Sequence, residues 1–386
     1  MNILFLTNAK IPHLGGKSSH IVELSNGLRT LGHNVHIISE SSIGFIGSLI
    51  MRIRKLFILH YKKSDFGEYS YKSMNITNLA IQNCLRRYLK AHKVDIISAQ
   101  DPSSAIIAFH AAKHNIPITL TMHSYFGKIM DEVSTSKRGI RQKDIDRNLH
   151  DDLESLKIVK YLICVDSRIE DDCVQFLKRM NLTLPICSIP NFVNTNDYNV
   201  ESCKSKELSK LKLGIEQTKS VIICIRRLVD KNGVIYGIDA MKNLDNCVLL
   251  VGGDGPNMEK LKCYVNENAL NDRVVFLGGI KGELKNLVYS AADFAIVPSI
   301  TLNGLQEATS ISAIESMSCG IPTIASEIGG LKQLIDDGKN GVLVPEQNSE
   351  AISNAICDLI NNQEKYTGPR SPRRSLTRWT SPRRRP

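Results

Sequence analysis

Strand-forming runs alternate with helical patterns along almost the whole chain, and this alternation most restricts the fold. The runs are short, rich in Ile, Val and Leu, and separated by helix-length stretches; in order they read ILFLT, VHIIS, DIISA, PITLTM, YLICV, VIICI, CVLLV, VVFLG, FAIVP, PTIAS and GVLVP. Continuous apolar strands between helices are typical of parallel sheets covered on both faces. The alternation continues too long for one doubly wound sheet. The sequence therefore predicts an α/β protein with two Rossmann-like domains.

The segment 188–198, SIPNFVNTNDY, interrupts the alternation with a proline and a polar run. We therefore expect one domain at residues 1–190 and a second at residues 191–366. A chain of 386 residues is long enough for two separate cores. Open α/β sheets bind ligands beyond the carboxyl ends of their strands, so both sheets are expected to face a central cleft that holds the ligand.

The last segment, residues 367–386, differs in composition from the rest of the chain. It reads TGPRSPRRSLTRWTSPRRRP, with seven arginines and no acidic residue, and without it the net charge of +10 falls to +3. A Pro/Arg/Ser-rich text without hydrophobic periodicity predicts a disordered tail. A native arm that tethers nucleic acid or anionic lipid is the alternative. The ordinary charge of the body predicts no specific nucleic-acid partner.

Cysteine usage and apolar runs indicate the compartment. The cysteines are scattered singly, without a C-x-x-C pair, and Met1 leads directly into NILFLT. We expect a cytoplasmic protein without structural zinc or disulfides. Residues 43–63 form an apolar, helix-capable stretch interrupted by Arg52, Arg54 and Lys55. Because it is too interrupted to span a bilayer, it is expected either to lie on an anionic membrane surface or to be a core helix whose basic residues face outward.

Two glutamates, Glu307 and Glu315, stand eight residues apart in EATSISAIESMSCG. If a helix begins just after Glu307, both carboxylates return to nearly the same side. The free N–H groups of Thr309, Ser310 and Ile311 would then lie where a phosphate is favoured. Carboxylates also accept hydrogen bonds from vicinal hydroxyls, so the segment outlines a nucleotide-sugar site. An amphipathic helix with two solvated glutamates is the alternative.

Other candidate residues follow predicted strands. Gly15 and Gly16 precede a helical pattern and allow a phosphate close to the backbone. They do not form the G-x-G-x-x-G fingerprint, which counts against NAD. Gly253 and Asp254 lie in the GGDGP loop after CVLLV, and His123 ends PITLTM. A tight turn and a packed histidine are the alternatives at these positions.

A cluster of cations follows the VIICI strand. Arg226, Arg227 and Lys231 lie in RRLVDKNG. Most such clusters form a solvated surface. At a strand end they can instead clamp a diphosphate, the arginines as bidentate donors and the lysine as a point charge.

Taken in order, these motifs resemble the retaining GT-B glycosyltransferases of the glycosyltransferase family 4 type (glycosyl transferases group 1), which include glycogen and sucrose synthases. The similarity runs from Met1 to about Tyr366 and rests on the glycine loop, TMH, IPN, RRL–KNG, GGDGP, the E-x7-E element and CGIPTIAS. The resemblance implies the GT-B fold, a nucleoside-diphosphate sugar as donor, and no metal or other cofactor.

The resemblance also implies roles for individual residues. His123 would contact the donor sugar, Arg227 and Lys231 the departing diphosphate, Glu307 the sugar and Glu315 the ribose.

Three departures from the family pattern stand out. Residues 308–310 read Ala-Thr-Ser where many relatives have glycines. Arg226 replaces the glycine of a GRL element, and Asn232 stands directly before Gly233, with Lys231 one residue earlier.

The sequence therefore predicts a retaining hexosyltransferase acting on a glycan or lipid-linked acceptor, in cell-surface polysaccharide or glycolipid synthesis. A nucleotide-sugar epimerase and a truncated, non-catalytic nucleotide-sugar-binding protein are the alternatives. A dehydrogenase is disfavoured by the missing fingerprint.

Overall fold

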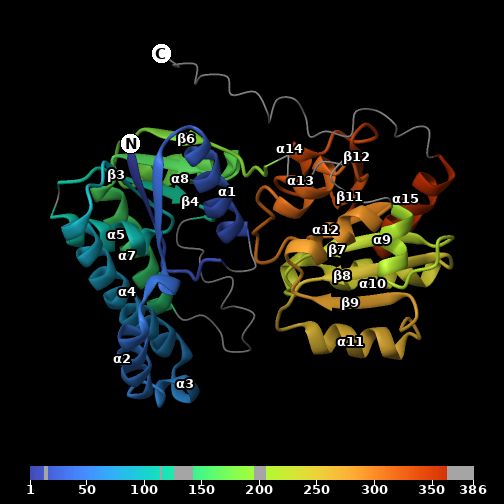
Figure 1. Cartoon of the computed structure of the whole chain (residues 1–386), viewed down its shortest axis with the longest axis horizontal. Helices are drawn as coiled ribbons and strands as arrows, with labels where there is room; N and C mark the ends of the chain where they lie inside the picture. The colour runs from blue at the N-terminus through green and yellow to red at the C-terminus, as the bar shows by residue number, and fades with distance from the viewer. Residues whose placement is uncertain (13–15, 114, 126–141, 195–205, 363–386) are drawn as a thin grey trace. The chain divides into compact units, whose positions relative to one another are not determined.

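The chain forms two compact units, Met1–Asn191 and a second that begins at Phe192. The computed structural model describes residues 1–12, 16–113, 115–125, 142–194 and 206–362 (Figure 1). The predictions for Gly15 and for the tail at 367–386 fall outside these residues.

The N-terminal unit is built on a six-stranded sheet in the order β2-β1-β3-β4-β5-β6, in which every neighbouring pair is parallel. Its strands are β1 (Asn2–Leu6), β2 (Asn34–Ile38), β3 (Ile96–Ala99), β4 (Ile118–Met122), β5 (Tyr161–Cys164) and β6 (Ile186–Ser188). Between them lie α1 (Gly16–Thr30), η1 (Glu40–Ser42), α2 (Phe45–Leu56), α3 (Tyr61–Ser64), α4 (Phe66–Ala91), α5 (Pro102–Ala112), α7 (Gln142–Ile158) and α8 (Ser167–Arg179).

The C-terminal unit contains a second parallel sheet, in the order β12-β11-β10-β7-β8-β9. Its strands are β7 (Ser220–Ile225), β8 (Cys247–Gly252), β9 (Val274–Gly278), β10 (Phe294–Val297), β11 (Thr323–Ser326) and β12 (Gly341–Val344). Its helices are α9 (Lys206–Lys212), η3 (Asp230–Asn232), α10 (Val234–Ala240), η4 (Met241–Asn243), α11 (Met258–Glu267), α12 (Gly282–Ala291), α13 (Ile311–Ser318), α14 (Leu331–Leu334) and α15 (Ser349–Asn361).

Strand β7 shows why the strands read as continuous apolar runs. Its alternate residues enter two different cores, because successive side chains of a strand point to opposite faces. Ile222 and Cys224 pack with residues of α10, α11 and α15, whereas Val221 and Ile223 pack with residues of α12. Helices therefore cover both faces of the sheet, and the predicted two-sheet α/β architecture is confirmed.

The loops after β7 and β8 are joined at the carboxyl edge of the second sheet. The N–H of Arg226 donates to the carbonyl of Gly252 at 2.8 Å, and the N–H of Leu228 to that of Asp254 at 2.9 Å. Gly253 has φ +144°, and a Cβ placed there would lie 1.9 Å from the Arg226 carbonyl oxygen. Only glycine fits this close approach.

Gly253→Ala is therefore expected to destabilise the C-terminal unit by about 2 kcal/mol more than Gly214→Ala. Gly214 is a matched control, because its φ is also positive (+69°) but nothing lies within 4 Å of a methyl group added there. Urea unfolding of the two variants measures the difference. Equal destabilisation would mean that the close approach to Arg226 contributes nothing.

Candidate functional site

Arg226 is the centre of a buried polar cluster at the carboxyl ends of β7 and β10. Its side chain is 5% exposed, and Nη2 lies 3.0 Å from Oε2 of Glu307. Nη2 also donates to Asn232 Oδ1 at 2.8 Å and to Ser299 Oγ at 2.9 Å. Nη1 donates to Ser310 Oγ at 2.7 Å and to Ser312 Oγ at 3.4 Å. One buried cation thus joins its own loop, residues 226–232, to Ser299 and to residues 307–312, which lie more than 70 positions away in the sequence.

Glu307 lies in the loop before α13 and not on the helix. The helix begins at Ile311, with Ser310 as its N-cap in an extended conformation. The expectation that a helix starts just after Glu307 is therefore wrong. The first-turn N–H groups that lack a partner within the helix belong to residues 311–313, while Thr309 and Ser310 are buried residues that precede the helix. The Glu307 carbonyl accepts from the N–H of Gly330 at 2.9 Å, which fixes the loop.

Glu315 is buried inside the unit, and the solvated-glutamate alternative is wrong for it. The residue is 4% exposed. Its Oε1 lies 2.7 Å from the ammonium of Lys285, and the hydroxyl of Tyr289 donates to Oε2 at 2.7 Å. Both partners lie on α12, one helical turn apart, so that α12 holds the carboxylate from one side. Neither partner stands out in the sequence.

The other two cations of the cluster point to solvent. Arg227 and Lys231 are exposed, in contrast to Arg226. Lys231 lies in the short helix η3, and its carbonyl accepts from the N–H of Ile300 at 2.9 Å. Asn232 is buried and donates through Nδ2 to the Arg227 carbonyl at 2.6 Å. The loop backbone is thus fixed while both cationic side chains remain accessible to an anion.

Gly253 and Asp254 lie beside the Arg226–Leu228 backbone. Asp254 is exposed, and one of its carboxylate oxygens lies 3.6 Å from a Cβ placed at Gly278. The loops after β7, β8 and β9 therefore meet at one edge, as parallel strands require.

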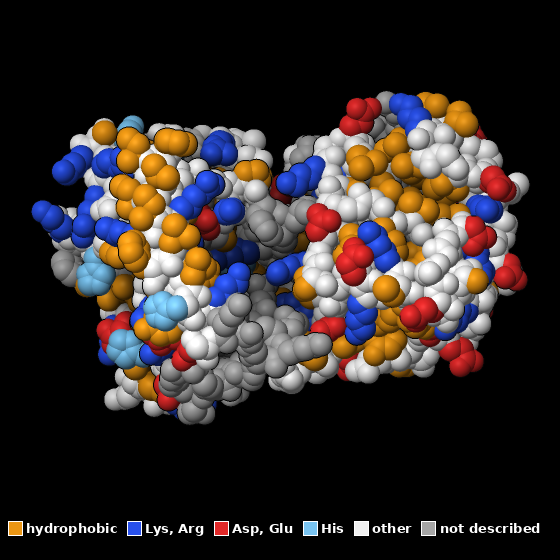
Figure 2. All heavy atoms as spheres, turned by 90° about the horizontal axis from the view of Figure 1, so that it is seen from below, with side chains coloured by type: hydrophobic (Ala, Val, Ile, Leu, Met, Phe, Trp, Pro, Cys, Tyr) orange, Lys and Arg blue, Asp and Glu red, His pale blue; other side chains and the backbone are white. Residues whose placement is uncertain are grey.

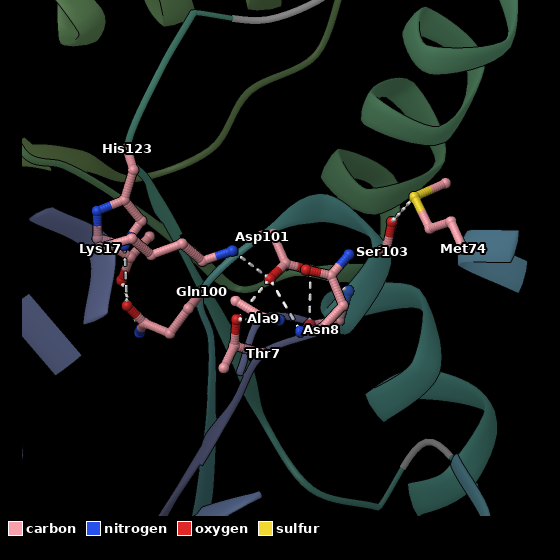
Figure 3. A network of polar contacts seen from close by, with 11 residues as sticks. Thr7, Asn8, Ala9, Lys17, Met74, Gln100, Asp101, Ser103 and His123 are labelled. Atoms are coloured by element: carbon pink, nitrogen blue, oxygen red, sulfur yellow. Dashed lines mark hydrogen bonds and ion pairs between the residues drawn. The ribbon is translucent and has the colours of Figure 1, made fainter. Parts of the chain in front are cut away.

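His123 follows β4 in the N-terminal unit and is half-buried. Its Nε2 lies 3.1 Å from Oε1 of Gln100, so the ring nitrogen donates to the amide oxygen (Figure 3). Gln100 is held in turn by Ser98 at 2.9 Å and Thr121 at 3.2 Å. Burial, with the neighbouring His20 and Lys17, lowers the pKa of His123 well below its usual value, so the ring is neutral at pH 7.

His20 packs edge-on against His123, with ring centroids 4.9 Å apart at 82°. Its Nδ1 lies 3.0 Å from Oδ1 of Asn191. Burial lowers the pKa of His20 to about 4, although the bond to Asn191 opposes the shift.

Lys17 and Asp101 form an ion pair that the sequence analysis missed. Gly16 is the first residue of α1, and the ammonium of the following Lys17 lies 2.7 Å from Oδ2 of Asp101, toward which it points in Figure 3. Asp101 also caps α5 and accepts from the Thr7 hydroxyl at 2.9 Å and the Ser104 N–H at 2.9 Å. Burial alone would raise the pKa of Asp101, but Lys17 and the hydrogen bonds from Ser104 hold it below its usual value.

Two family models match the chain. The model "Glycosyltransferase Family 4" matches residues 14–197, and the model "Glycosyl transferases group 1" matches residues 205–371. Together they cover both units in the order that the motifs predict. The chain belongs to the GT4-type glycosyltransferases.

Curated relatives of this GT4-type chain match it over part of their length. An uncharacterized glycosyltransferase of Methanocaldococcus jannaschii is 26% identical over 227 residues, 55% of this chain and 56% of the relative. A GDP-mannose-dependent alpha-(1-6)-phosphatidylinositol monomannoside mannosyltransferase of Mycolicibacterium smegmatis is 32% identical over 149 residues, 37% of this chain and 39% of the relative. The chain thus matches less than two thirds of either relative.

Solved glycosyltransferase structures share the fold over nearly the whole chain. The sucrose-phosphate synthase of Thermosynechococcus elongatus has a TM-score of 0.71 at 20% identity and covers 96% of this chain and 92% of its own. HepE of Anabaena, in complex with UDP-glucose, has a TM-score of 0.66 at 19% identity and covers 96% and 93%. The predicted GT-B fold is confirmed.

In this GT4-type chain the predicted site residues form two groups. The C-terminal unit brings together Arg226, Arg227, Lys231, Gly253, Asp254, Glu307 and residues 309–311, with Glu315 farther along α13. The N-terminal unit contains Gly16 at the start of α1 and His123 after β4. Within the described residues no three His, Cys, Asp or Glu side chains cluster as metal ligands.

Proposed function

We propose that this chain transfers a sugar from a nucleoside-diphosphate sugar, with UDP or GDP as the nucleotide, to a glycan or lipid-linked acceptor, with retention of the anomeric configuration. The observation that carries the proposal is the entry to α13. The Glu307 carboxylate precedes the N-terminus of α13 and contacts Arg226, and the exposed Arg227 and Lys231 lie on the same loop as Arg226. The buried Glu315 lies farther along the helix. The names of similar proteins include a GDP-mannose donor and a bound UDP-glucose, which supports this class of donor.

Each part of a nucleotide sugar has a complementary group in this arrangement. The first-turn N–H groups of α13, with Arg227 and Lys231, suit the diphosphate. Glu315 suits the ribose hydroxyls, because a carboxylate accepts hydrogen bonds from vicinal hydroxyls. Glu307 suits the hydroxyls of the sugar. His123 keeps its proposed role toward the donor sugar, as a neutral ring that can donate or accept a hydrogen bond.

Charge stabilisation is the chemical contribution that we propose for the cations. Negative charge grows on the diphosphate as the glycosidic bond breaks, and fixed positive groups beside it lower the barrier. We propose that Arg227 and Lys231 supply this charge without a metal ion or other cofactor. Calorimetry of UDP- and GDP-sugars in EDTA tests donor binding; binding that appears only after Mg²⁺ or Mn²⁺ is added would contradict a metal-free site.

Arg227→Ala is expected to lower kcat about 100-fold, because it removes a cation that acts mainly on the developing charge. Donor KM should change much less, because the diphosphate of the bound donor carries less negative charge than the diphosphate in the transition state. The control is Arg179→Ala, which removes an exposed arginine on α8. An increase in KM with unchanged kcat would show that Arg227 contributes only uniform binding.

We also propose that the protein docks on the cytoplasmic face of a membrane through α2 and α3. Helix α2 buries none of its residues, and the core-helix alternative is therefore wrong. Large apolar side chains are exposed, among them Phe45 (85%), Ile46 (72%) and Phe57 (76%). Figure 2, which views the molecule from the side where α2 and α3 lie in Figure 1, shows hydrophobic side chains gathered beside Lys and Arg.

An apolar helix face beside basic residues is typical of helices that lie in the interface of an anionic bilayer. Among the described residues no helix is long and apolar enough to cross a membrane. A surface site suits a lipid-linked acceptor, and the Mycolicibacterium relative carries a phosphatidylinositol acceptor in its name.

Phe45→Ser with Phe57→Ser is expected to weaken binding to phosphatidylglycerol-containing vesicles about 100-fold, since each buried phenyl ring contributes about 1.5 kcal/mol or more. The control is Leu31→Ser with Leu211→Ser, which removes two other exposed apolar side chains (74% and 68%). Vesicle co-sedimentation measures both. Equal losses in the two double variants would contradict docking through α2.

A further inference from the structure

The hydrogen bonds that the Arg226 side chain already makes distinguish it from Arg227 and Lys231. Its two Nη atoms carry four hydrogens and lie within hydrogen-bond distance of five acceptors: Asn232 Oδ1, Ser299 Oγ, Ser310 Oγ, Ser312 Oγ and Glu307 Oε2. No Nη hydrogen remains for a phosphate oxygen unless one of these bonds breaks. Because bidentate contact with a phosphate needs at least one Nη hydrogen, a buried side chain with its Nη hydrogens so engaged is unsuited to clamp a diphosphate.

The partners of Arg226 indicate what its guanidinium positions. Glu307 carries the only negative charge among them, and Ser310 and Ser312 belong to the N-cap and first turn of α13. The same oxygen of Glu307 that contacts Arg226 lies 3.5 Å from the Ser299 hydroxyl. Arg226 therefore fixes both the Glu307 carboxylate and the start of the helix.

The charges around Arg226 also indicate that it positions Glu307. A guanidinium beside the positive end of a helix dipole is unfavourable, and in a buried position it requires a counter-charge. Glu307 supplies that charge and is thereby held in one orientation. The pair is nearly neutral, so the exposed Arg227 and Lys231 remain as the cations available to the diphosphate.

We propose that Arg226 is a positioning residue that holds Glu307 in the orientation in which its carboxylate accepts hydrogen bonds from the donor sugar. Arg226 acts on sugar recognition and not on the diphosphate, and Asn232 is its second anchor. This inference rests on the proposed function and names which part of the donor the Arg226–Glu307 pair serves.

Calorimetry with the free nucleoside diphosphate and with its sugar conjugate tests the proposal. The variant is Arg226→Met, which keeps the stem and removes the guanidinium, and the matched control is Arg227→Met. Arg226→Met should bind UDP or GDP within about threefold of wild type. It should lose most of the additional affinity that the sugar gives, and kcat/KM should fall about 100-fold. Arg227→Met should show the reverse pattern: it should weaken binding of free UDP or GDP, which carries the negative charge released by bond breaking, more than binding of the sugar conjugate.

Two further variants keep the test independent of folding. Glu307→Gln keeps the shape of the side chain and should reproduce the selective loss of sugar-dependent affinity. Asn232→Lys in the Arg226→Met background should recover part of it, because Asn232 Oδ1 lies only 2.8 Å from the lost Nη2 and a lysine ammonium can occupy that place.

The outcomes distinguish this proposal from the proposed function. If Arg226→Met weakens UDP or GDP as much as the sugar conjugate, Arg226 is a diphosphate ligand and the inference is overturned. It is also overturned if the variant keeps the full sugar-dependent affinity. If the wild-type chain binds neither UDP- nor GDP-sugars, the proposed function fails and this inference fails with it.

Discussion

Glu307→Leu is expected to lower the free energy of unfolding of the C-terminal unit by about 3–5 kcal/mol, because it leaves the Arg226 guanidinium buried without a counter-charge. The Arg226 side chain is 5% exposed and lies 3.0 Å from the Glu307 carboxylate. Its remaining partners are neutral hydroxyl and amide oxygens, which solvate a cation only in part. Urea unfolding, followed by hydrogen exchange in peptides of the C-terminal unit, measures the loss.

The double variant Arg226→Met with Glu307→Leu should lose less than the sum of the two single variants, because it removes both charges together. The control is Glu327→Leu, which breaks the exposed pair with Lys332 at 3.0 Å and should change stability by less than about 1 kcal/mol. If Glu307→Leu lowered stability no more than this control, the pair would be energetically equivalent to a surface ion pair.

Lowering the pH from 7 to 4 is expected to remove up to about 3 kcal/mol of stability from the N-terminal unit through His20 alone. Burial lowers the pKa of His20 from 6.5 to about 4. The unfolded chain therefore binds more protons than the folded chain between these values. The contribution of neutral His20 is complete above pH 6.5 and is lost as the pH falls toward 4. His123, whose pKa is also lowered by burial, adds to the loss.

His20→Asn isolates this contribution. The asparagine amide can still donate to Asn191 but cannot be protonated, so the variant should lose less stability than wild type between pH 7 and 4. The pair of Lys17 and Asp101, which holds the pKa of Asp101 below its usual value, is present in both proteins, so its contribution to the pH dependence cancels in the comparison. Urea unfolding at several pH values measures the slope. Parallel pH profiles for wild type and variant would show that His20 is not buried as described.

The strands were the most predictable part of this protein. Each predicted apolar run forms a strand, because buried parallel strands require apolar side chains on both faces. The structure contains one further strand, β6, that none of the predicted runs includes. Its three residues, ICS, at the edge of the sheet are too short and too polar to stand out as an apolar run.

The start of α13 and the partners of Glu307 and Glu315 were not predictable. Ser310 takes the N-cap position that favours serine, which places Glu307 before the helix. Arg226 contacts residues 73 and 84 positions away in the sequence, and Lys285 lies 30 positions from Glu315. Such contacts depend on which loops the sheet topology brings together, and no local spacing records this.

Helix α2 shows a different limit of prediction from the sequence. Its apolar periodicity predicts a helix with one apolar face but not what covers that face. The structure leaves the face exposed, which excludes the core helix; docking on a membrane is our proposal for what covers the face.

The proposed transfer reaction is tested most directly by following the anomeric proton signals of UDP-glucose and GDP-mannose by NMR, with the protein, EDTA and a lipid-linked acceptor fraction. We expect protein- and acceptor-dependent release of the nucleoside diphosphate and a new glycosidic signal with the anomeric configuration of the donor, both strongly reduced in Arg227→Ala. A donor sugar that is converted to its epimer without acceptor, or a product with inverted configuration, would contradict this account.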